Sequence, residues 1–419
     1  MQRRTVLQSV GMAAGLAGIG RQAGFAASLK ALPPVELLAK NAEAYWKQIR
    51  REQFSLPEWR YFLNNGSLGV APRRVVAAVS QYLEDAATLV SDEYPRWGYE
   101  TLDEERSELA EFVGCKKDEL AITHNATEGL SCIAEGLDLK PGDEVVMTDN
   151  EHVSGKSPWY RRAQRDGIVV KEVKLPLPPK DSAQLADLMI SAIGPKTKVL
   201  FFSGIVTTTG LIMPMKELCA AARAKGIISI VDGAHVHGQI PLRIDSIGCD
   251  YFVGSPHKWM FAPAGSGFLY IREENLERLW PTIVTGDWDT RSLKAGRFMR
   301  FGTNNRAIVA GMIAGLRFLK ELGPERVYSR IHELAKLNYK MASERPYIKL
   351  LSGADDRLYG SLVTVLFPGK DMAPLWKKLK EQRVWCLTSD RLRLSTHIHT
   401  RPQDLEKFYS ITDELWKRA

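Results

Sequence analysis

The sequence predicts an α/β fold with a large domain, whose mostly parallel sheet is covered by helices on both faces, and a small α+β domain at the C-terminus. Continuously apolar runs such as KVLFFSGIV (198–206) and IISIVDG (227–233) alternate with amphipathic stretches. That alternation is typical of strands buried on both faces and joined by helical crossovers. After residue 323 the order changes, because three apolar runs alternate with two helical stretches.

The elements of the large domain follow in chain order. A helix over 35–51 leads into a segment punctuated by glycine and proline, FLNNGSLGVAP (62–72). Apolar residues recurring every three or four positions then predict helices at 73–90, 100–113, 128–136, 153–165 and 215–225. Apolar runs rich in β-branched and aromatic residues predict strands at 119–125, 144–149, 168–175, 198–206, 227–233, 250–256 and 267–272. The last two are close enough in sequence for one to run antiparallel.

A long helix at 304–323 is predicted to bridge the two domains. Beyond it we expect strands at 361–368, 384–390 and 391–397, and helices at about 372–382 and 402–418. The predicted organisation is an export signal (1–26), an N-terminal arm (27–70), a large domain (71–303), the bridging helix (304–323) and a small domain (324–419).

Composition excludes several protein classes. The 419 residues are 45% apolar, 25% charged and 9% aromatic, which is ordinary for a globular protein and argues against disorder. No apolar run reaches the roughly 18–20 residues of a membrane span. The five cysteines have no CxxC spacing, so neither a disulfide framework nor a zinc site is expected.

Residues 1–26 differ from the rest. Arg3 and Arg4 precede a Gly/Ala-rich stretch, and small residues follow at Ala26 and Ala27. This order resembles a twin-arginine signal, which implies a folded protein exported to the periplasm. The alternative is a basic N-terminus that contains two arginines by coincidence.

The net charge argues against a nucleic-acid partner. The 57 Lys and Arg against 49 Asp and Glu give +8, and residues 1–26 contain three arginines and no acid, so +5 remains without them. The densest basic stretch, RRAQR (161–165), is predicted to lie on a solvated helix face.

Polar clusters follow four of the predicted strands: THNATEG (123–129), TDNEH (148–152), VDGAHVHG (231–238) and GSPHKW (254–259). Ligands gather at the carboxyl ends of strands in such sheets, so the clusters predict one shared site. None has metal-ligand spacing, and we expect no metal.

Two residues of these clusters indicate the chemistry. A carboxylate at a buried strand end, Asp232, needs a cationic partner, and a lysine removed from water, Lys258, becomes a nucleophile and general base. Pyridoxal phosphate requires this pair: the carboxylate keeps the pyridine nitrogen protonated, and the amine holds the aldehyde as a Schiff base. The alternative is a structural ion pair between the two.

Other residues are candidates for holding the cofactor. Ala126, Thr127 and Glu128 lie at a predicted helix N-terminus, which favours an anion such as phosphate. Ser255 and His257 approach from the lysine loop. His152 is placed to stack on the ring, and its alternative role is to cap a helix. For His257, the alternative is a solvated position in a loop.

The block VDGAHVHG…GCDYFVGSPHKWMFAPAGSGFLY closely resembles the cofactor region of the class V aminotransferase family. These are fold-type I pyridoxal-phosphate proteins, including cysteine desulfurases and isopenicillin N epimerase-like proteins, and the similarity covers about residues 60–410. The resemblance implies that Lys258 forms the Schiff base, Asp232 pairs with the pyridinium and His152 stacks on the ring. It further implies that the phosphate is contacted by Thr127, Ser255 and His257. The ring hydroxyl would be bonded by His235 and, less securely, by Thr207.

The resemblance also concerns substrate and partner. FGTNN (301–305) looks like the family segment whose threonine, here Thr303, reaches the phosphate of the neighbouring subunit, which implies a homodimer with shared active sites. Arg393 matches the arginine that grips the substrate carboxylate, with a local pair to Asp390 as the alternative. The loop LNNGSLG (63–69) resembles a site-lining loop of the epimerase-like branch, so Asn65 is expected to contact substrate.

Departures from the family pattern matter as well. The Tyr-Asn usual after the arginine motif is His399-Thr400 here, which predicts an altered substrate rim. Cys386 lies inside the apolar run VWCLT and is predicted to be a core residue, and no cysteine stands in a mobile loop roughly fifteen residues before Arg393. Cysteine desulfurase activity is therefore disfavoured.

These features predict an exported pyridoxal-phosphate enzyme acting on the amino group of an amino acid or a peptide-linked amino acid. The motifs leave transamination, epimerisation, elimination and decarboxylation open. The combination with export resembles periplasmic enzymes that modify the glutamate of pyoverdine, so aminotransferase-type tailoring of this siderophore is the first prediction. An epimerase and a carbon–sulfur lyase are alternatives, and a catalytically inactive cofactor-binding protein is an alternative of another class.

Overall fold

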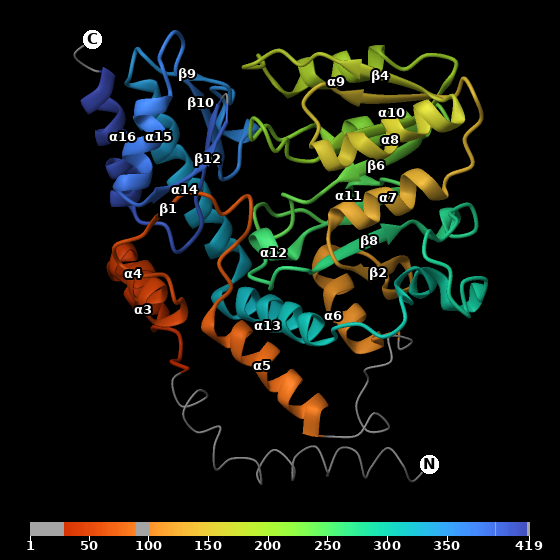
Figure 1. Cartoon of the computed structure of the whole chain (residues 1–419), viewed down its shortest axis with the longest axis horizontal. Helices are drawn as coiled ribbons and strands as arrows, with labels where there is room; N and C mark the ends of the chain where they lie inside the picture. Colours follow the sequence, from red (N-terminus) through yellow and green to blue (C-terminus); the bar gives the residue numbers. More distant parts are fainter. Residues whose placement is uncertain (1–28, 89–100, 390, 417–419) are drawn as a thin grey trace.

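A computed structural model of the chain describes residues 29–88, 101–389 and 391–416 (Figure 1). The predicted export signal and Asp390 lie outside these ranges. Within them, no helix combines the length and apolarity that crossing a bilayer requires.

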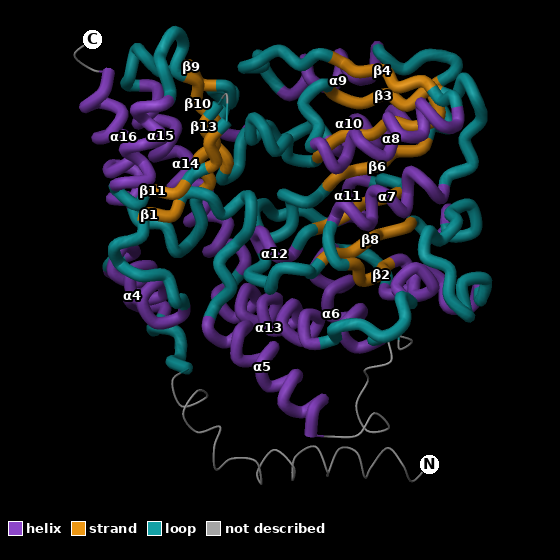
Figure 2. Tube along the Cα trace, viewed as in Figure 1, coloured by secondary structure: helices purple, strands orange, loops and turns teal. Residues whose placement is uncertain are grey.

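The larger sheet has seven strands in the order β2-β8-β7-β6-β5-β3-β4, stacked along one side of the molecule (Figure 2). Strand β8 is antiparallel to both neighbours and the other pairs are parallel, which confirms the predicted α/β fold and its one antiparallel strand. The strands are β2 Leu120–Thr123, β3 Glu144–Thr148, β4 Val169–Val173, β5 Thr197–Ser203, β6 Ile228–Asp232, β7 Tyr251–Gly254 and β8 Gly267–Ile271.

Two groups of helices cover this sheet. Helices α7 and α8 pack against each other, and α9, α10 and α11 form a second contiguous group. Every residue of β2, β7 and β8 is buried, which explains why their sequences are continuously apolar instead of alternating. The helices are α5 Arg73–Thr88, α6 Asp103–Val113, α7 Ala126–Gly136, α8 Val153–Asp166, α9 Ser182–Ser191, α10 Met215–Ala224 and α11 Ile244–Ile247.

A second, antiparallel sheet lies in the C-terminal part, in the order β12-β13-β10-β9. It has its own apolar core, to which Leu63 of the N-terminal segment also belongs. Strand β1 (Tyr61–Phe62) pairs in parallel with β11 (Val384–Trp385), so the N-terminal arm joins this unit. The remaining elements are β9 Lys349–Leu350, β10 Leu362–Leu366, β12 Leu387–Thr388, β13 Leu392–Ser395, α14 Pro324–Ser343, α15 Ala373–Glu381 and α16 Pro402–Trp416.

Several helices differ from the prediction. The helix expected over 35–51 is two helices, α3 (Val35–Lys40) and α4 (Ala42–Gln53), because the extended Asn41 between them caps α4 by accepting a hydrogen bond from the amide of Ala44 at 3.0 Å. Helix α13 (Ala307–Leu322) lies within the stretch 304–323 that was predicted to be a bridging helix, and the helix α14 that follows it was not predicted. The sequence Gly323-Pro324 is typical of the end of a helix. Proline is, however, also well suited to the first position of a new helix.

The basic stretch on α8 is only partly solvated. Arg161 and Arg165 are exposed, as expected. Arg162 is buried, and its guanidinium donates to the carbonyl oxygens of Ala134 and Leu137, both at 2.6 Å. The prediction of a solvated face is therefore wrong for Arg162, which satisfies the free carbonyls at the end of α7.

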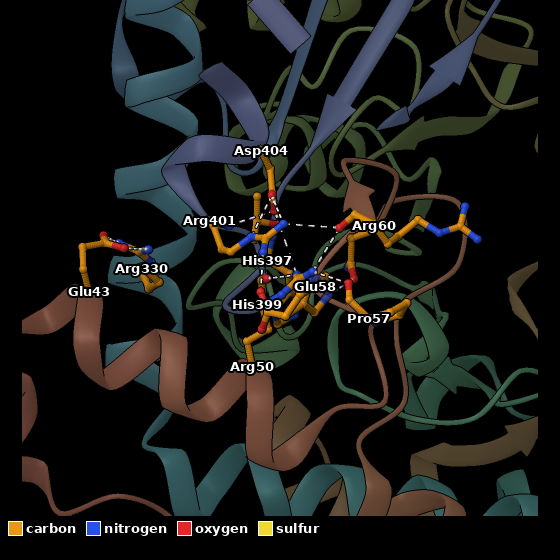
Figure 3. Close-up of polar contacts among 12 residues, drawn as sticks. Glu43, Arg50, Pro57, Glu58, Arg60, Arg330, His397, His399, Arg401 and Asp404 are labelled. Atoms are coloured by element: carbon orange, nitrogen blue, oxygen red, sulfur yellow. Dashed lines mark hydrogen bonds and ion pairs between the residues drawn. The ribbon is translucent and has the colours of Figure 1, made fainter. Parts of the chain in front are cut away.

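A polar cluster around the buried Arg50, Arg401 and Asp404 fastens the N-terminal arm to the C-terminal unit (Figure 3). Arg50 of α4 donates to the carbonyl oxygen of His399 at 2.5 Å and to that of Arg60 at 3.0 Å. Arg401 donates to Glu58 at 2.6 Å and to Asp404 at 2.9 Å. These bonds fix the segment 397–404, which lies next to the lysine loop described below.

Candidate active site

A cavity of about 190 Å³ opens at the carboxyl ends of β5, β6 and β7. The polar clusters that follow different strands in the sequence meet here. Most of the predicted site residues line it: Ala126, Thr127, His152, Thr207, Asp232, His235, Ser255, His257 and Lys258.

Lys258 enters the cavity from α12 (Pro256–Trp259), a single turn that follows β7 and lies between the two sheets in Figure 1. Its amine nitrogen Nζ is 3.0 Å from Nε2 of His235. Burial lowers the pKa of Lys258 to about 8, an effect that Asp232 opposes and Arg393 increases. The amine is therefore available as a nucleophile and base near neutral pH.

Asp232 ends strand β6 and is 6% exposed. Its Oδ1 accepts a hydrogen bond from the amide of Ala234 at 3.0 Å. In the described part of the chain no ion pair within 4.0 Å joins it to Lys258 or to another cation, so the alternative of a structural ion pair is wrong. A buried carboxylate left in this state is suited to a cationic ligand atom.

The N-terminus of α7 forms one wall of the cavity. Asn125 caps the helix by accepting from the amide of Glu128 at 2.9 Å, and Ser255 Oγ accepts from the amide of Ala126 at 3.2 Å. The positive end of the α7 dipole, with the side chains of Thr127 and Ser255 in the cavity wall, fits an anion.

Glu128 needs a correction, because it does not line the cavity. Its amide is taken by Asn125, and its carboxylate turns back to accept from the amide of His124 at 2.7 Å and to contact the His124 ring at 2.8 Å. The negative charge of Glu128 is thereby held away from the anion site.

His152 has the helix-cap role that was its alternative, and it also lines the cavity, whereas stacking on the cofactor ring stays a prediction. It lines the cavity, and as the N-cap of α8 its Nδ1 accepts from the amide of Ser154 at 3.1 Å. Because Nδ1 is an acceptor, the proton of the neutral ring is on Nε2. Burial, the largest cause, together with Lys258 lowers the pKa of His152 and keeps the ring neutral.

Arg393 of β13 lies directly behind the cavity wall and is 3% exposed. It donates to Thr207 Oγ1 at 2.7 Å and to Ser67 Oγ at 2.9 Å, and both of these residues line the cavity. No described carboxylate lies within 4.0 Å, Nε has no partner, and burial lowers the pKa of the guanidinium to about 10. A buried, uncompensated cation fits an anionic substrate group.

The hydroxyl of Thr207 accepts a hydrogen bond from Arg393. Thr207 and His235 both line the cavity, and their predicted bonds to the cofactor ring hydroxyl stay predictions.

Two further predictions are corrected. Asn65 is buried, its Nδ2 donates to the carbonyl oxygen of Lys258 at 2.7 Å, and its Oδ1 lies 3.2 Å from Nε2 of His399. Both polar ends are thus committed to protein, and Asn65 supports the lysine loop without contacting substrate. His399 is 1% exposed beneath that loop, so it does not form a substrate rim.

Thr303 is exposed and outside the cavity of its own chain. Its predicted contact with a neighbouring subunit stays a prediction.

Sequence reasoning missed two buried groups beside the cavity. Glu151 accepts from Thr148 at 2.6 Å and from Ser203 at 2.5 Å, and burial raises its pKa to about 7. Trp259 donates from its indole nitrogen to Nδ1 of His235 at 3.3 Å. Both stand next to predicted residues, His152 and Lys258, but nothing in the sequence indicates which way their side chains point.

Cys386 is confirmed as a core residue. Burial raises the pKa of its thiol to about 12, so it is protonated at neutral pH.

Comparison with known proteins gives a consistent picture. The family model "Aminotransferase class-V" matches residues 60–389. Isopenicillin N epimerase of Streptomyces clavuligerus is 32% identical over 395 residues, covering 89% of this chain and 99% of that protein. A probable cysteine desulfurase of Mycolicibacterium paratuberculosis is 28% identical over 334 residues, 75% of this chain and 47% of that protein.

The fold also matches a solved structure. It is a mutant enzyme with glycine covalently linked to its pyridoxal phosphate cofactor, with a TM-score of 0.77 and 24% identity, covering 87% of this chain and 99% of that one. The fold is thus the fold-type I arrangement of pyridoxal-phosphate enzymes.

Proposed function

Since this chain belongs to the class V aminotransferase family, we propose that its cavity removes a proton from the α-carbon of an amino acid or a peptide-linked amino acid, with Lys258 as the base. Its cofactor is pyridoxal phosphate. One observation carries the proposal: Lys258 and Asp232 reach into the same cavity without pairing with each other.

The residues of the cavity fit this cofactor. The unpaired carboxylate of Asp232 suits a protonated pyridine nitrogen, and the N-terminus of α7 with Ser255 suits a phosphate. His152 supplies a neutral ring for stacking. Bound there, pyridoxal phosphate supplies an electron sink for the charge left on the α-carbon.

The protein groups then have distinct tasks. The unprotonated amine of Lys258 takes the proton from the α-carbon. Asp232 would hold the pyridine nitrogen of the cofactor from the end of β6. The terminal nitrogens of Arg393 bind Thr207, Asn64 and Ser67, so its unpartnered Nε–H and its positive charge are what attract the substrate carboxylate from behind the wall.

Among the outcomes left open by the motifs, epimerisation has the best support. The epimerase of S. clavuligerus aligns with this chain over nearly its whole length. A cysteine desulfurase is disfavoured because the Cys386 thiol is buried and protonated, whereas a persulfide-forming cysteine needs an accessible thiolate.

Aminotransferase-type tailoring of the pyoverdine glutamate stays a prediction. It depends on the twin-arginine pattern of residues 1–26 and hence on a periplasmic location, and that segment lies outside the described residues. A glutamate with a free α-carboxylate suits the positive charge of Arg393. The same charge also suits many other substrates that have a free carboxylate.

The test is incubation of the cofactor-loaded chain in D₂O with L-amino acids, isopenicillin N and glutamate-bearing pyoverdine. Chiral chromatography with mass spectrometry distinguishes the outcomes. An epimerase gives an inverted product that carries deuterium at the α-carbon, an aminotransferase gives a keto acid, and a lyase releases the β- or γ-group. Lys258→Ala is the control, and absence of deuterium exchange in every substrate with the loaded wild-type chain would contradict the proposal.

A further inference from the structure

The imidazole of His235 lies between two consecutive residues of α12, Lys258 and Trp259. Its Nε2 is 3.0 Å from the Lys258 amine, and its Nδ1 is 3.3 Å from the indole nitrogen of Trp259. The histidine is 3% exposed and Trp259 is fully buried, so solvent does not compete for either contact.

The position of the proton on the His235 ring follows from the hydrogen-bonding capacity of its two neighbours. An indole N–H only donates, so Nδ1 of His235 accepts and carries no proton. Burial, followed by the charges of Lys258 and Arg393 and the rings of His152 and His257, holds the pKa of His235 well below its ordinary value. The neutral ring has a single proton, which is therefore on Nε2 and points at the Lys258 amine.

An N–H directed at an amine is favourable only if the amine has a free lone pair. An ammonium group has none, and two N–H groups would then face each other. We propose that Trp259 is a positioning residue that locks His235 in the Nε2-protonated tautomer and thereby favours the unprotonated, nucleophilic form of Lys258. The benefit of an unprotonated Lys258 rests on the proposed function. The direction of the hydrogen bonds from Trp259 to His235 and from His235 to Lys258 does not depend on any reaction.

Other charged groups act on the same amine. Asp232 faces Lys258 from the end of β6 and favours the ammonium, whereas Arg393 from β13 disfavours it. Removal of the indole N–H of Trp259 leaves Asp232 and Arg393 unchanged. The effect of Trp259 on the Lys258 amine can therefore be measured separately from the effects of these two charges.

Trp259 is itself held in place by a stack of rings. Its indole lies parallel to the His397 ring, at 17° and 5.8 Å, and His399 stacks on His397 at 15° and 5.6 Å. His397 Nδ1 accepts from the amide of Ile398 at 2.8 Å, so its Nε2 carries the proton and donates to the Trp259 carbonyl at 3.2 Å. Arg50 binds the carbonyl of His399, and Figure 3 shows this end of the stack beside the N-terminal arm.

The variant Trp259→Phe keeps an aromatic ring for stacking but removes the donor. Trp159→Phe is the matched control, because Trp159 is equally buried but packs against Phe201, away from His235. Circular dichroism verifies that both variants are folded.

The first measurement is the ¹⁵N NMR spectrum of the histidine rings in the full wild-type chain without cofactor, with His235→Gln identifying the His235 signals. We expect a protonated Nε2 and an unprotonated Nδ1. The reverse pattern in wild type overturns the proposal, whether or not any variant folds.

The second measurement is reductive methylation of Lys258 by formaldehyde and cyanoborohydride across pH, quantified by peptide mass spectrometry. In Trp259→Phe the ring is free to present an unprotonated Nε2 to an ammonium, so the rate below pH 8 should fall about threefold or more relative to wild type. The rates should converge at high pH, and Trp159→Phe should follow wild type. A Trp259→Phe profile that overlays wild type overturns the proposal. Because neither readout requires turnover, failure of the proposed reaction is distinguishable from failure of this inference.

Discussion

The amine of Lys258, the carboxylate of Asp232 and the guanidinium of Arg393 lie in or directly behind one cavity wall without pairing with one another. Leaving buried charges uncompensated is costly for folding. The cost is recovered only when a ligand brings the matching charges, a pyridinium for Asp232 and a carboxylate for Arg393. The charge arrangement thus describes the ligand that the site is built to receive.

The hydroxyl of Thr207 orients the Arg393 fork at 2.7 Å. Thr207→Val keeps the shape of the side chain and removes the acceptor. We expect KM for a substrate with a free carboxylate to rise about tenfold, since a hydrogen bond to a charged group contributes about 1.5–3 kcal/mol, while kcat changes little. Steady-state kinetics measures both constants, and a fall in kcat with unchanged KM would contradict this role.

Lys258 gives a pH dependence with a definite sign. Its pKa is lowered to about 8, chiefly by burial, and only the unprotonated amine attacks an aldehyde. Attachment of pyridoxal phosphate to the cofactor-free chain should therefore accelerate with pH up to about 8 and then level off. Stopped-flow absorbance measures the rate; a rate that keeps rising to about pH 10, as for an exposed lysine, would show that burial does not lower this pKa.

At the residue scale, sequence reasoning placed the cavity residues correctly where strand ends decide their position. Asp232 and Lys258 directly follow buried strands, so topology alone brings them together. It was wrong for Asn65, Glu128 and His399. Asn65 donates to the distant carbonyl of Lys258, Glu128 turns back to the amide of His124, and His399 contacts the side chain of Asn65. No pattern in the sequence encodes those contacts.

At the scale of elements, the lysine turn α12 is held by backbone contacts from the loop 63–69. The amide of Gly69 donates to the carbonyl of His257 at 2.9 Å, and Asn65 binds the carbonyl of Lys258. The loop was predicted to line the site, and in the structure it contributes Ser67 to the wall while fixing the turn behind it.

Gly69→Ala tests this support. A Cβ atom would stand 2.3 Å from the Lys258 carbonyl oxygen and 2.9 Å from that of His257, both backbone atoms that cannot rotate away. We expect a loss of about 1–3 kcal/mol in the free energy of unfolding and weaker cofactor retention. Urea unfolding measures the first and visible absorbance the second.

The control is Gly286→Ala, because a Cβ there meets nothing within 4 Å. Equal stability of the two variants would mean that the loop yields and that Gly69 does not fix the lysine turn.

Helices and strands were predicted correctly where the apolar pattern alone decides them. They were missed where a turn or capping signal interrupts that pattern. The buried strands and α13 appear as expected. The 20-residue helix α14 was missed because Gly323-Pro324 both ends one helix and begins the next. The break at Asn41 was missed because the apolar pattern continues across it, and only the capping bond shows the interruption.

At the scale of the whole molecule, the site lies where the two sheets meet. Strand β6 of the large sheet supplies Asp232, the turn α12 after β7 supplies Lys258, and β13 of the C-terminal sheet supplies Arg393. The arm joins the two through Arg50 and through Asn65. Such an arrangement predicts that cofactor and substrate binding stabilise the contact between the units.

The predicted homodimer with shared sites gives a complementation test. In a hybrid of Lys258→Ala and Thr303→Val chains, one site has an intact lysine and an intact threonine from the partner. We expect subunit mixing after mild dissociation to restore tight cofactor binding, measured by absorbance after gel filtration. If the mixture only averages the two parent variants, Thr303 does not act across a subunit interface.

The central claim is that Lys258 is the residue that holds pyridoxal phosphate in the cavity beside Asp232. Borohydride reduction of the cofactor-loaded chain, followed by peptide mass spectrometry, makes that bond permanent and locates it. We predict a phosphopyridoxyl group on the peptide that contains Lys258. A fully loaded chain with the group on another lysine, or on none, would contradict the claim.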